Sequence, residues 1–529
     1  MKRINNFIIL MVVGLLLSSC DNFLDVMPDN RTTLDSPQKI KDLLITAYPT
    51  TNYALICELS ADNFIDNRAD NPTLKADPFD RMDTEIFGWQ AVSSSTEEDS
   101  PYNLWEQYYQ SIAAANHVLD AIDKLKESGN TTDMSPQKGE ALILRAYCHF
   151  MLVNIFSKTY KDENISKNDL GITYMTKPER QVVVQYKRNS VAEVYDSIAI
   201  DIENGIKLID DKSYDVPKYH FTKAAADAFA SQFYLYKRDY ANVIKYANDV
   251  LGEGDPTSLL RDWSVTYSNP ESELDAYLSA KSPANLLLVP TFSTYARRFI
   301  NTQYGANGSA LDGTLHGSGP TWKNQPEFLK GWIWTYGQEY GLIISKIEEL
   351  FEYTDKVARI GYAHIVRTEF TTDAVLLNRA EAKIMSGDIP GGVADLDYWN
   401  KSHKNAKTLT QENIRSFYTP SKKDFVFTFH TTELSPDFTV TSEQKPFIDC
   451  VLHFRRLERM LEGQRWFDIK RYGIELTHIA GRDQKEITLP YDDDRRAIQI
   501  PTDVIAAGLE ANPRQETSTN SNFTLTLVY

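Results

Sequence analysis

The chain has 529 residues, of which 42% are hydrophobic, and its 56 basic and 73 acidic side chains give a net charge of −17. This length exceeds the size at which a single core keeps growing, so we expect one large domain or two closely packed ones. The acidic balance argues against nucleic acid or anionic lipid as the main partner, and we interpret it as a solvated surface. Beyond the N-terminal segment no apolar run is long enough to cross a bilayer, so any passage of solute across a membrane must belong to another protein.

The first residues form a secretory signal of the bacterial lipoprotein type. Lys2 and Arg3 precede an apolar run from Phe7 to Leu17, which ends in Leu-Ser-Ser-Cys at Cys20. A run of about eleven residues is too short to span a bilayer, and small residues directly before a cysteine mark a cleavage site. We therefore predict that residues 1–19 are removed and that Cys20 becomes the lipidated first residue of the mature chain. The alternative is an ordinary signal peptide with a coincidental cysteine.

Residues 61–100 form a polar segment with aromatic residues at no fixed period, which indicates irregular loop structure. Asp66, Asn67 and Arg68 lie in this early loop, and Trp89 stands alone before three consecutive serines. An aromatic ring beside amide, carboxylate or guanidinium groups is an economical way to hold the flat C–H face of a sugar. These four residues are therefore candidate ligand-binding residues.

Helices are predicted over residues 104–125, 137–156 and 191–208. The second is apolar almost all round, so it should be central, and Trp105 on the first helix should belong to the core. The cysteines other than Cys20 number three, so no complete disulfide framework exists in spite of an exported context. Cys148 in the central helix is most simply a buried thiol, and no pair of cysteines has the spacing of metal ligands.

Two later segments have the pattern of helical hairpins. Residues 240–251 carry an apolar stripe that opens after Asp239, the expected N-cap, and another helix ends only three residues upstream. The same plan returns as a helix through Leu376 and Ala380, a Ser-Gly-Asp turn at 386–388 and a second helix from Ile389. Helices joined so tightly must pack antiparallel, and the pattern resembles a tetratricopeptide unit without its Trp and Gly positions. Ordinary helical hairpins are the alternative.

Residues 252–345 form a second loop-rich region that contains half of the tryptophans. Its candidate ligand-binding rings are Trp263, Tyr295, Trp322, Trp332 and Trp334. Trp332 and Trp334 alternate with Ile333 and would face one way together in an extended segment. The alternative is that these rings pack the loops onto the helices.

Short strands are predicted at residues 286–291, 425–430 and 497–500. The predicted fold class is therefore mainly α, with a tetratricopeptide-like scaffold of helical hairpins, long loop-rich insertions and a few short β-strands.

The charged clusters near the C-terminus favour structure over catalysis. Glu462, Arg465 and Asp468 lie three to six residues apart beside two basic residues, which suits an ion-pair network at a helix end better than an acid pair for glycoside hydrolysis. The three aspartates at 492–494 lack the alternating oxygen ligands of a calcium loop and predict a solvated turn. We find no catalytic motif, no metal site and no cofactor motif, although carboxylates far apart in sequence are not excluded.

Several motifs together resemble the SusD/RagB family of outer-membrane nutrient-binding lipoproteins. Cys-x-x-Phe-Leu-Asp-x-x-Pro begins at Cys20, and Gly-Glu-Ala followed by Arg-Ala lies in the segment 139–156. The most recognisable match is Glu-Gly-Gln-Arg-Trp-Phe-Asp at 462–468, after Glu458 and before Lys-Arg. The ending at 500–513 is similar too, although the usual Gln-Asn-Pro-Gly-Tyr close is absent. The resemblance covers the chain from Cys20 to about Gln515 as a single domain.

The resemblance implies a function as well as a fold. It implies a lipid-anchored protein on the outer surface of a Gram-negative outer membrane that binds a nutrient, usually glycan, and sits as a lid on a TonB-dependent SusC-like barrel. The ligand site of relatives tends to lie between an early loop and the later loop-rich region. Such a protein is not an enzyme. A peptide-binding lid, a surface glycoside hydrolase and a purely structural assembly protein remain the alternatives.

Overall fold

In the computed structural model the described residues are 34–70, 81–93, 95–180, 185–263, 270–299, 303–306, 314, 317–329, 333–335 and 342–514. The predicted signal peptide, Cys20 and Trp332 lie outside these residues. The short helices are α3 (Ala54–Ser60), α4 (Asn67–Asp70), α5 (Arg81–Phe87), α8 (Glu163–Ser166), α12 (Pro270–Tyr277), α16 (Gln411–Phe417), α17 (Thr431–Leu434) and α20 (Thr502–Ala506).

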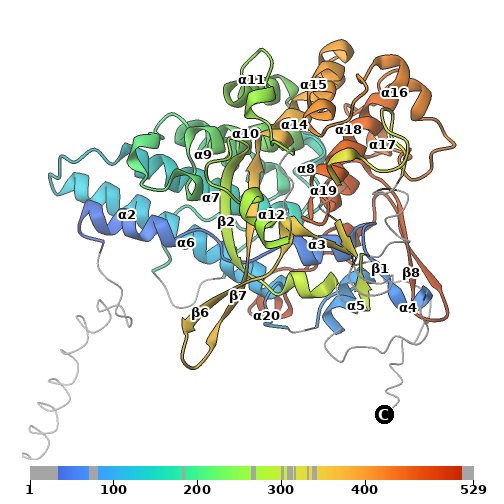
Figure 1. Ribbon diagram of the computed structural model, residues 1–529. Helices are drawn as coiled ribbons and strands as arrows, with labels where there is room; N and C mark the ends of the chain where they lie inside the picture. The colour runs from blue at the N-terminus through green and yellow to red at the C-terminus, as the bar shows by residue number, and fades with distance from the viewer. Residues whose placement is uncertain are drawn as a thin grey trace, which may run out of the picture.

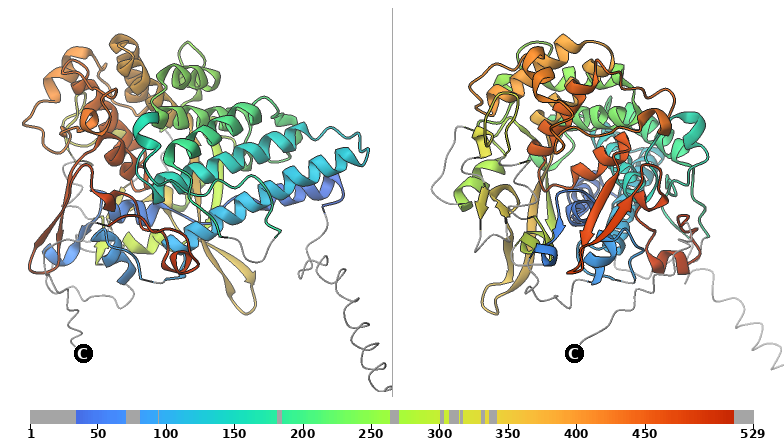
Figure 2. Two further views of the ribbon diagram at one scale, coloured as in Figure 1. Left: turned by 180° about the vertical axis from the view of Figure 1, so that it is seen from behind. Right: turned by 90° about the vertical axis from the view of Figure 1, so that its right-hand side faces the viewer.

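Four helices from the first half of the chain pack side by side (Figures 1 and 2). They are α2 (Pro37–Thr46), α6 (Pro101–Glu127), α7 (Ser135–Phe156) and α9 (Val191–Gly205), with α6 on α2 and α7, and α7 on α9. The three predicted helices are confirmed within a few residues at each end. By length and composition α7 would suit a bilayer, but its apolar stretch is buried in the protein, as predicted for the central helix. Cys57, Cys148 and Cys450 are buried free thiols.

Both predicted hairpins are confirmed. Helices α10 (Lys223–Lys237) and α11 (Tyr240–Leu251) join through Arg238, at φ 64°, and Asp239, whose side chain accepts from the Asn242 backbone N–H. Helices α14 (Thr372–Met385) and α15 (Ile389–Ser402) join through the predicted turn, and α11 packs on α14. The chain is thus mainly α, as the hydrophobic pattern predicts.

A three-stranded antiparallel sheet crosses beside these helices in the order β2-β7-β6. Strand β2 (Asn285–Phe292) is the predicted strand, whereas β6 (Leu350–Asp355) and β7 (Ile360–Thr371) were not predicted. In all three ribbon views the distal part of the β6–β7 hairpin stands away from the body of the protein (Figures 1 and 2). Strand β7 ends at Thr371 and α14 begins at the next residue, so the sheet is connected directly to the second helical hairpin.

The strands predicted at 425–430 and 497–500 are wrong. Both segments are irregular and pair with no strand, and apolar side chains of both are buried in the core. The Phe425 ring stacks on His453 at 4.0 Å, and Ile498 donates a single backbone hydrogen bond to Ile155. The other short strands are β1 (Ile65–Asp66), β3 (Tyr304–Gly305), β4 (Ile333–Thr335), β5 (Leu342–Ile344), β8 (Leu476–Ala480) and β9 (Lys485–Leu489).

Helices α18 (Lys445–Glu458) and α19 (Gln464–Tyr472) carry the C-terminal charged motif. Glu462 pairs with Lys346 at 2.8 Å, Arg465 with Asp62 at 2.8 Å, and Asp468 with Arg455 at 2.9 Å. The first two pairs tie this motif to distant segments of the chain, and the third ties α19 to α18. The predicted ion-pair network is confirmed, and its charges are not arranged around a common cleft.

Candidate functional site

The early loop and the later loop-rich region meet in space, although more than two hundred residues separate them. Strand β1 pairs antiparallel with β3, with Ile65 opposite Gly305 and Asp66 opposite Tyr304. The Asn67 N–H donates to the Gln303 carbonyl at 2.8 Å, and the β8–β9 hairpin joins through a hydrogen bond from Gly481 N–H to Asp66 at 2.8 Å. One face of the molecule thus combines three loop regions.

Asp66 and Asn67 are buried inside this junction and hold it together. The Asp66 carboxylate accepts from Gln303 at 3.2 Å and from Gly481, which leaves it turned away from solvent. Arg68 differs, because 22% of its side chain is exposed while it pairs with Asp66 at 3.3 Å. Of the three polar candidates in the early loop, only Arg68 presents a charged group at the surface.

Trp89, a candidate ligand-binding residue, does not present its ring at the surface. Its side chain is buried, its indole N–H donates to the Ser60 carbonyl at 3.0 Å, and its ring stacks on His478 at 4.1 Å. Phe87 stacks on the same imidazole at 4.2 Å. The β8–β9 hairpin brings His478 over the early loop, and this contact with a distant segment covers the tryptophan.

Trp263 and Tyr295 are also buried, so neither presents an exposed aromatic ring to a ligand. The Trp263 ring packs on Phe328 at 4.8 Å, and the Tyr295 hydroxyl donates to the Leu461 carbonyl at 2.9 Å. For these two residues the alternative interpretation, that the rings pack the loops onto the helices, is confirmed. Trp105 is buried as predicted, and Trp466 is buried too.

The remaining tryptophans keep their place among the candidates. Trp322 is half-buried, donates its indole N–H to Gly317 at 3.1 Å and packs against Phe454. Trp334 lies in β4, which pairs with β5 so that Trp334 is opposite Ile343. The side chain of Trp334 is not among the described ones, so the shared face predicted for Trp332 and Trp334 stays a prediction.

Sequence reasoning missed the most exposed aromatic surface of the described chain. Phe292, Phe351, Tyr353 and Tyr362 lie on the β2-β7-β6 sheet, with 41% to 52% of each residue exposed. Phe292 contacts Tyr362 at 5.3 Å between ring centroids, and Phe351 contacts Tyr353 at 4.9 Å. The alternation of apolar and polar residues over 350–355 was the signal that a strand with an aromatic face begins there.

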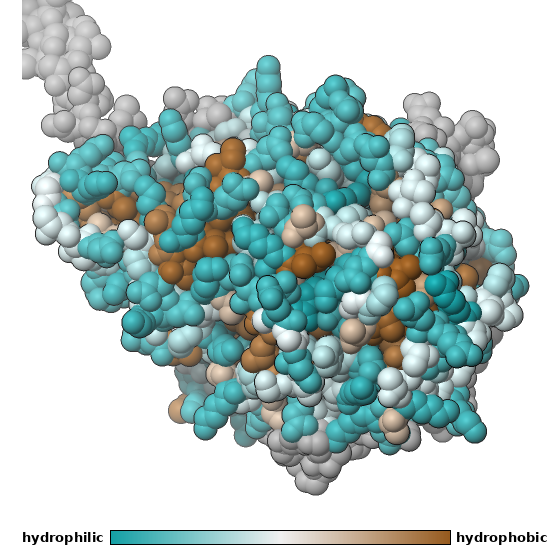
Figure 3. Space-filling view, turned by 90° about the horizontal axis from the view of Figure 1, so that it is seen from above, coloured by the Kyte–Doolittle hydropathy of each residue, from teal (hydrophilic) through white to brown (hydrophobic). Residues whose placement is uncertain are grey.

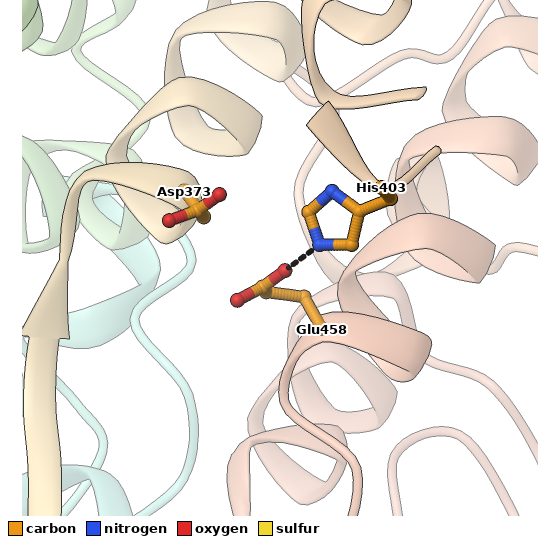
Figure 4. Close-up of side chains that lie close together, drawn as sticks. All are labelled: Asp373, His403 and Glu458. Carbon is orange, nitrogen blue, oxygen red and sulfur yellow. Dashed lines mark hydrogen bonds and ion pairs between the residues drawn. The ribbon is translucent and has the colours of Figure 1, made fainter. Parts of the chain in front are cut away.

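One buried cluster has the residue types of a metal site. Asp373, His403 and Glu458 stand at the ends of α14, α15 and α18, with potential ligand atoms within 4.8 Å of one another. Figure 4 shows the His403 imidazole directed at the Glu458 carboxylate, with an Nε2 to Oε2 distance of 2.8 Å. His403 Nδ1 faces the Trp399 carbonyl at 2.7 Å, so both imidazole nitrogens already have protein partners.

The charges of this cluster balance within the protein. Burial alone would raise the pKa of Glu458, but the hydrogen bond and charge of His403 outweigh it and lower the pKa to about 2. Burial and the neighbouring Glu458 raise the pKa of Asp373 to about 6. All three residues are buried, so the cluster fastens three helix ends together and offers no opening to a substrate.

The upper surface of the molecule carries several hydrophobic patches. Seen from above, it is mostly hydrophilic, and its hydrophobic residues form several separate patches (Figure 3). This agrees with the interpretation of the acidic charge as a solvated surface.

Antiparallel helical hairpins in sequence, carrying long loops that meet on one face, define a tetratricopeptide-like α protein. Residues 22–235 match the family model described as "Starch-binding associating with outer membrane", and residues 334–522 match the model of the SusD family. The chain belongs to the SusD/RagB-like family.

Individual relatives agree in sequence and fold. SusD-like protein P38 of Formosa agariphila is 21% identical over 510 residues, which cover 89% of this chain and 92% of that protein. A Bacteroides vulgatus protein assigned to sugar binding has a TM-score of 0.65 and 18% identity over 91% of this chain and 99% of its own. A SusD-like carbohydrate binding protein from the same organism has a TM-score of 0.56 and 16% identity over 89% and 96%.

Proposed function

We propose that this chain is a surface lipoprotein that captures an oligosaccharide and delivers it, as a lid, to a TonB-dependent SusC-like barrel in the outer membrane. The observation that carries the proposal is the β1–β3 junction, which unites the two loop regions from which ligand contacts are expected. Family membership supports the ligand class, because the matched family model is described by starch binding and outer-membrane association. The predicted lipidation of Cys20 supports the location.

Within this proposal the ligand contacts come from a reduced set of residues. Arg68 offers a partly exposed guanidinium beside the junction, and Trp322 offers a half-buried ring. Trp332 and Trp334 complete the set as the proposed rings on which a sugar stacks. The buried candidates Asp66, Asn67, Trp89, Trp263 and Tyr295 act by positioning the loops.

No catalytic role is part of the proposal. Carboxylates of the C-terminal motif are held in ion pairs with basic side chains, and the Asp373, His403 and Glu458 cluster is buried. A glycoside hydrolase needs two carboxyl groups that flank a bound sugar.

The test is a binding panel with the full mature chain in which Cys20→Ala removes the lipid. Soluble polysaccharides and their oligosaccharides are titrated by calorimetry, and each mixture is then examined for cleavage products. Saturable binding without products is expected, and Trp334→Ala should weaken it without lowering the melting temperature. Released products would instead assign a hydrolase, and absence of binding to every glycan would shift the ligand class to peptides.

A further inference from the structure

The described chain contains a well-formed cavity away from the β1–β3 junction. It encloses about 300 Å³ between helix α6, residues 173–179, Tyr186 and the C-terminal segment 504–509. This volume lies at the lower end of the range for small-molecule sites, which are mostly apolar with a few placed polar groups. The glycan proposal makes no use of this cavity.

The walls of the cavity are mostly apolar. Ile112 from α6, Met175, Val504 and Leu509 supply aliphatic or thioether surface, and the Trp105 and Tyr109 rings lie beside them with centroids 5.0 Å apart. A polyhydroxylated sugar would bring many hydroxyl groups against these walls and lose their hydration. The cavity therefore suits an apolar body better than a glycan.

Two polar side chains of the lining are already occupied by the protein. Tyr109 donates its hydroxyl to the Thr173 carbonyl at 2.9 Å. The Asn116 amide donates to the Met175 carbonyl at 3.1 Å and accepts from Arg145 at 2.8 Å. These bonds fix the wall formed by residues 173–177 against α6 and leave neither side chain as a primary ligand partner.

One charged donor at the cavity remains without a protein acceptor among the described residues. The ammonium of Lys177, an exposed residue at the rim, has no ion-pair partner in the same part of the chain. The one carboxylate of the lining, Glu179, accepts from the Tyr186 hydroxyl. The open charged donor at the rim is thus the Lys177 ammonium.

We propose that this cavity binds an apolar monocarboxylic acid, such as a medium-chain fatty acid, as a site separate from the glycan site. The hydrocarbon body lies among Ile112, Met175, Val504 and Leu509, where its burial contributes about 25 cal/mol per Å² of apolar surface. The carboxylate lies at the rim, where it accepts from the Lys177 ammonium. A charge-assisted hydrogen bond to an ammonium is the strongest single polar contact that this lining offers.

The test uses the full mature Cys20→Ala chain and three probes of equal length: decanoate, decanol and decylammonium, each titrated by calorimetry below its micelle concentration. Decanoate is expected to bind at one site and at least tenfold more tightly than decanol. Lys177→Gln should weaken decanoate about tenfold and leave decanol unchanged. Lys126→Gln, an exposed lysine on the same helix as Trp105, is the matched control.

Leu509→Trp should fill the cavity and abolish decanoate binding while glycan binding and the melting temperature are retained. This variant separates the two proposals, because loss of the fatty-acid site leaves the glycan titration intact. Equal affinity for decanoate and decanol, tighter binding of decylammonium, or decanoate affinity that Lys177→Gln and Leu509→Trp leave unchanged would each overturn the proposal. Absence of saturable decanoate binding would overturn it as well.

Discussion

Tyr295 shows how a ring from the loop-rich region can serve the scaffold. Its hydroxyl donates to the carbonyl of Leu461, a residue at φ 61° that precedes the motif of α19. The left-handed conformation is unfavourable for leucine, so this turn depends on its surroundings.

Tyr295→Phe should therefore lower the free energy of unfolding by about 1 kcal/mol, because the buried Leu461 carbonyl loses its donor. Glycan affinity should not change. Urea denaturation of the variant and the parent chain measures the first effect, and calorimetry the second. If the variant had the stability of the parent chain and bound glycan more weakly, Tyr295 would be a ligand-binding residue.

Substitution of the exposed rings of the β6–β7 hairpin, unlike that of Tyr295, should have little effect on stability. Tyr353 and Tyr362 are about half exposed, so Tyr353→Ala and Tyr362→Ala should change stability by about 0.5 kcal/mol or less. Trp263→Ala, which empties a buried position, should cost about 3 to 5 kcal/mol. Thermal unfolding of the three variants makes the comparison. A large loss at either tyrosine would mean that its ring is part of the folded core.

At the scale of elements, the close approach of α7 and α9 depends on two glycines. A Cβ on Gly139 would stand 2.9 Å from the Gly205 carbonyl oxygen and 3.0 Å from the Ile209 nitrogen, both backbone atoms. Gly139→Ala should destabilise the chain by about 1 to 3 kcal/mol, because the two helices must move apart.

Gly254→Ala is the matched control, since nothing lies within 4 Å of its added Cβ. Denaturant midpoints of the two variants test the contrast. Equal midpoints would show that the helix crossing accommodates a methyl group without a shift.

A buried charge network joins α14, α18 and α19. Glu381 accepts from Arg455 at 2.7 Å, from Tyr472 at 2.7 Å and from Arg471. Burial alone would raise the pKa of Glu381, but the two guanidinium groups outweigh it and lower the pKa to about 2.

Because the folded-state pKa lies below the ordinary value of 4.5, the network stabilises the fold above that pH and loses its effect as the pH falls toward 2. Glu381→Gln should cost about 3 kcal/mol or more at pH 7 by leaving two buried cations underpaired. The difference in the free energy of unfolding between Glu381→Gln and the parent chain should decrease by about 3 kcal/mol as the pH falls from 4.5 to 2. Urea denaturation of both chains across this pH range measures this difference. A difference that does not change with pH would contradict the lowered pKa of Glu381.

The helices could be predicted because their signals are local. The stripe of α11 and the Asp239 cap lie within a dozen residues, and the structure places both as predicted. Strand pairing is not local. Strand β2 pairs with β7, which lies far along the chain, whereas the segment 425–430 has residues typical of a strand but no strand to pair with. A short extended segment becomes a strand only where another segment meets its edge, which composition does not reveal.

The same limit applies to the candidate site. The two loop regions named from the sequence meet where β1 pairs with β3, and their role in ligand binding stays a prediction. Whether a given ring is exposed depends on distant segments of the chain, as His478 over Trp89 shows. Polar residues of the early loop were equally ambiguous, since Asp66 is buried by a hairpin far along the chain. Residue type thus suggested candidates, and tertiary contacts decided which of them face outward.

At the scale of the whole molecule, we expect the predicted N-terminal signal and the folded body to make separable contributions. The described structure begins beyond Cys20, and the helical body from α2 onward has its own extensive core. A lipid on Cys20 would therefore fix where the protein resides without taking part in its packing. Membrane attachment by acyl chains rises with buried hydrocarbon, about 0.8 kcal/mol per methylene group, so its loss should release the chain completely.

Cys20→Ala should accordingly move the protein from the membrane fraction to the soluble fraction of the exporting cell. The melting temperature and the glycan affinity of the released chain should equal those of the detergent-extracted parent. Fractionation with an antibody, followed by thermal unfolding and calorimetry, gives the three readouts. A variant that stays with the membrane would show that another surface anchors the chain, and a variant that unfolds at lower temperature would tie the lipidated segment to the core.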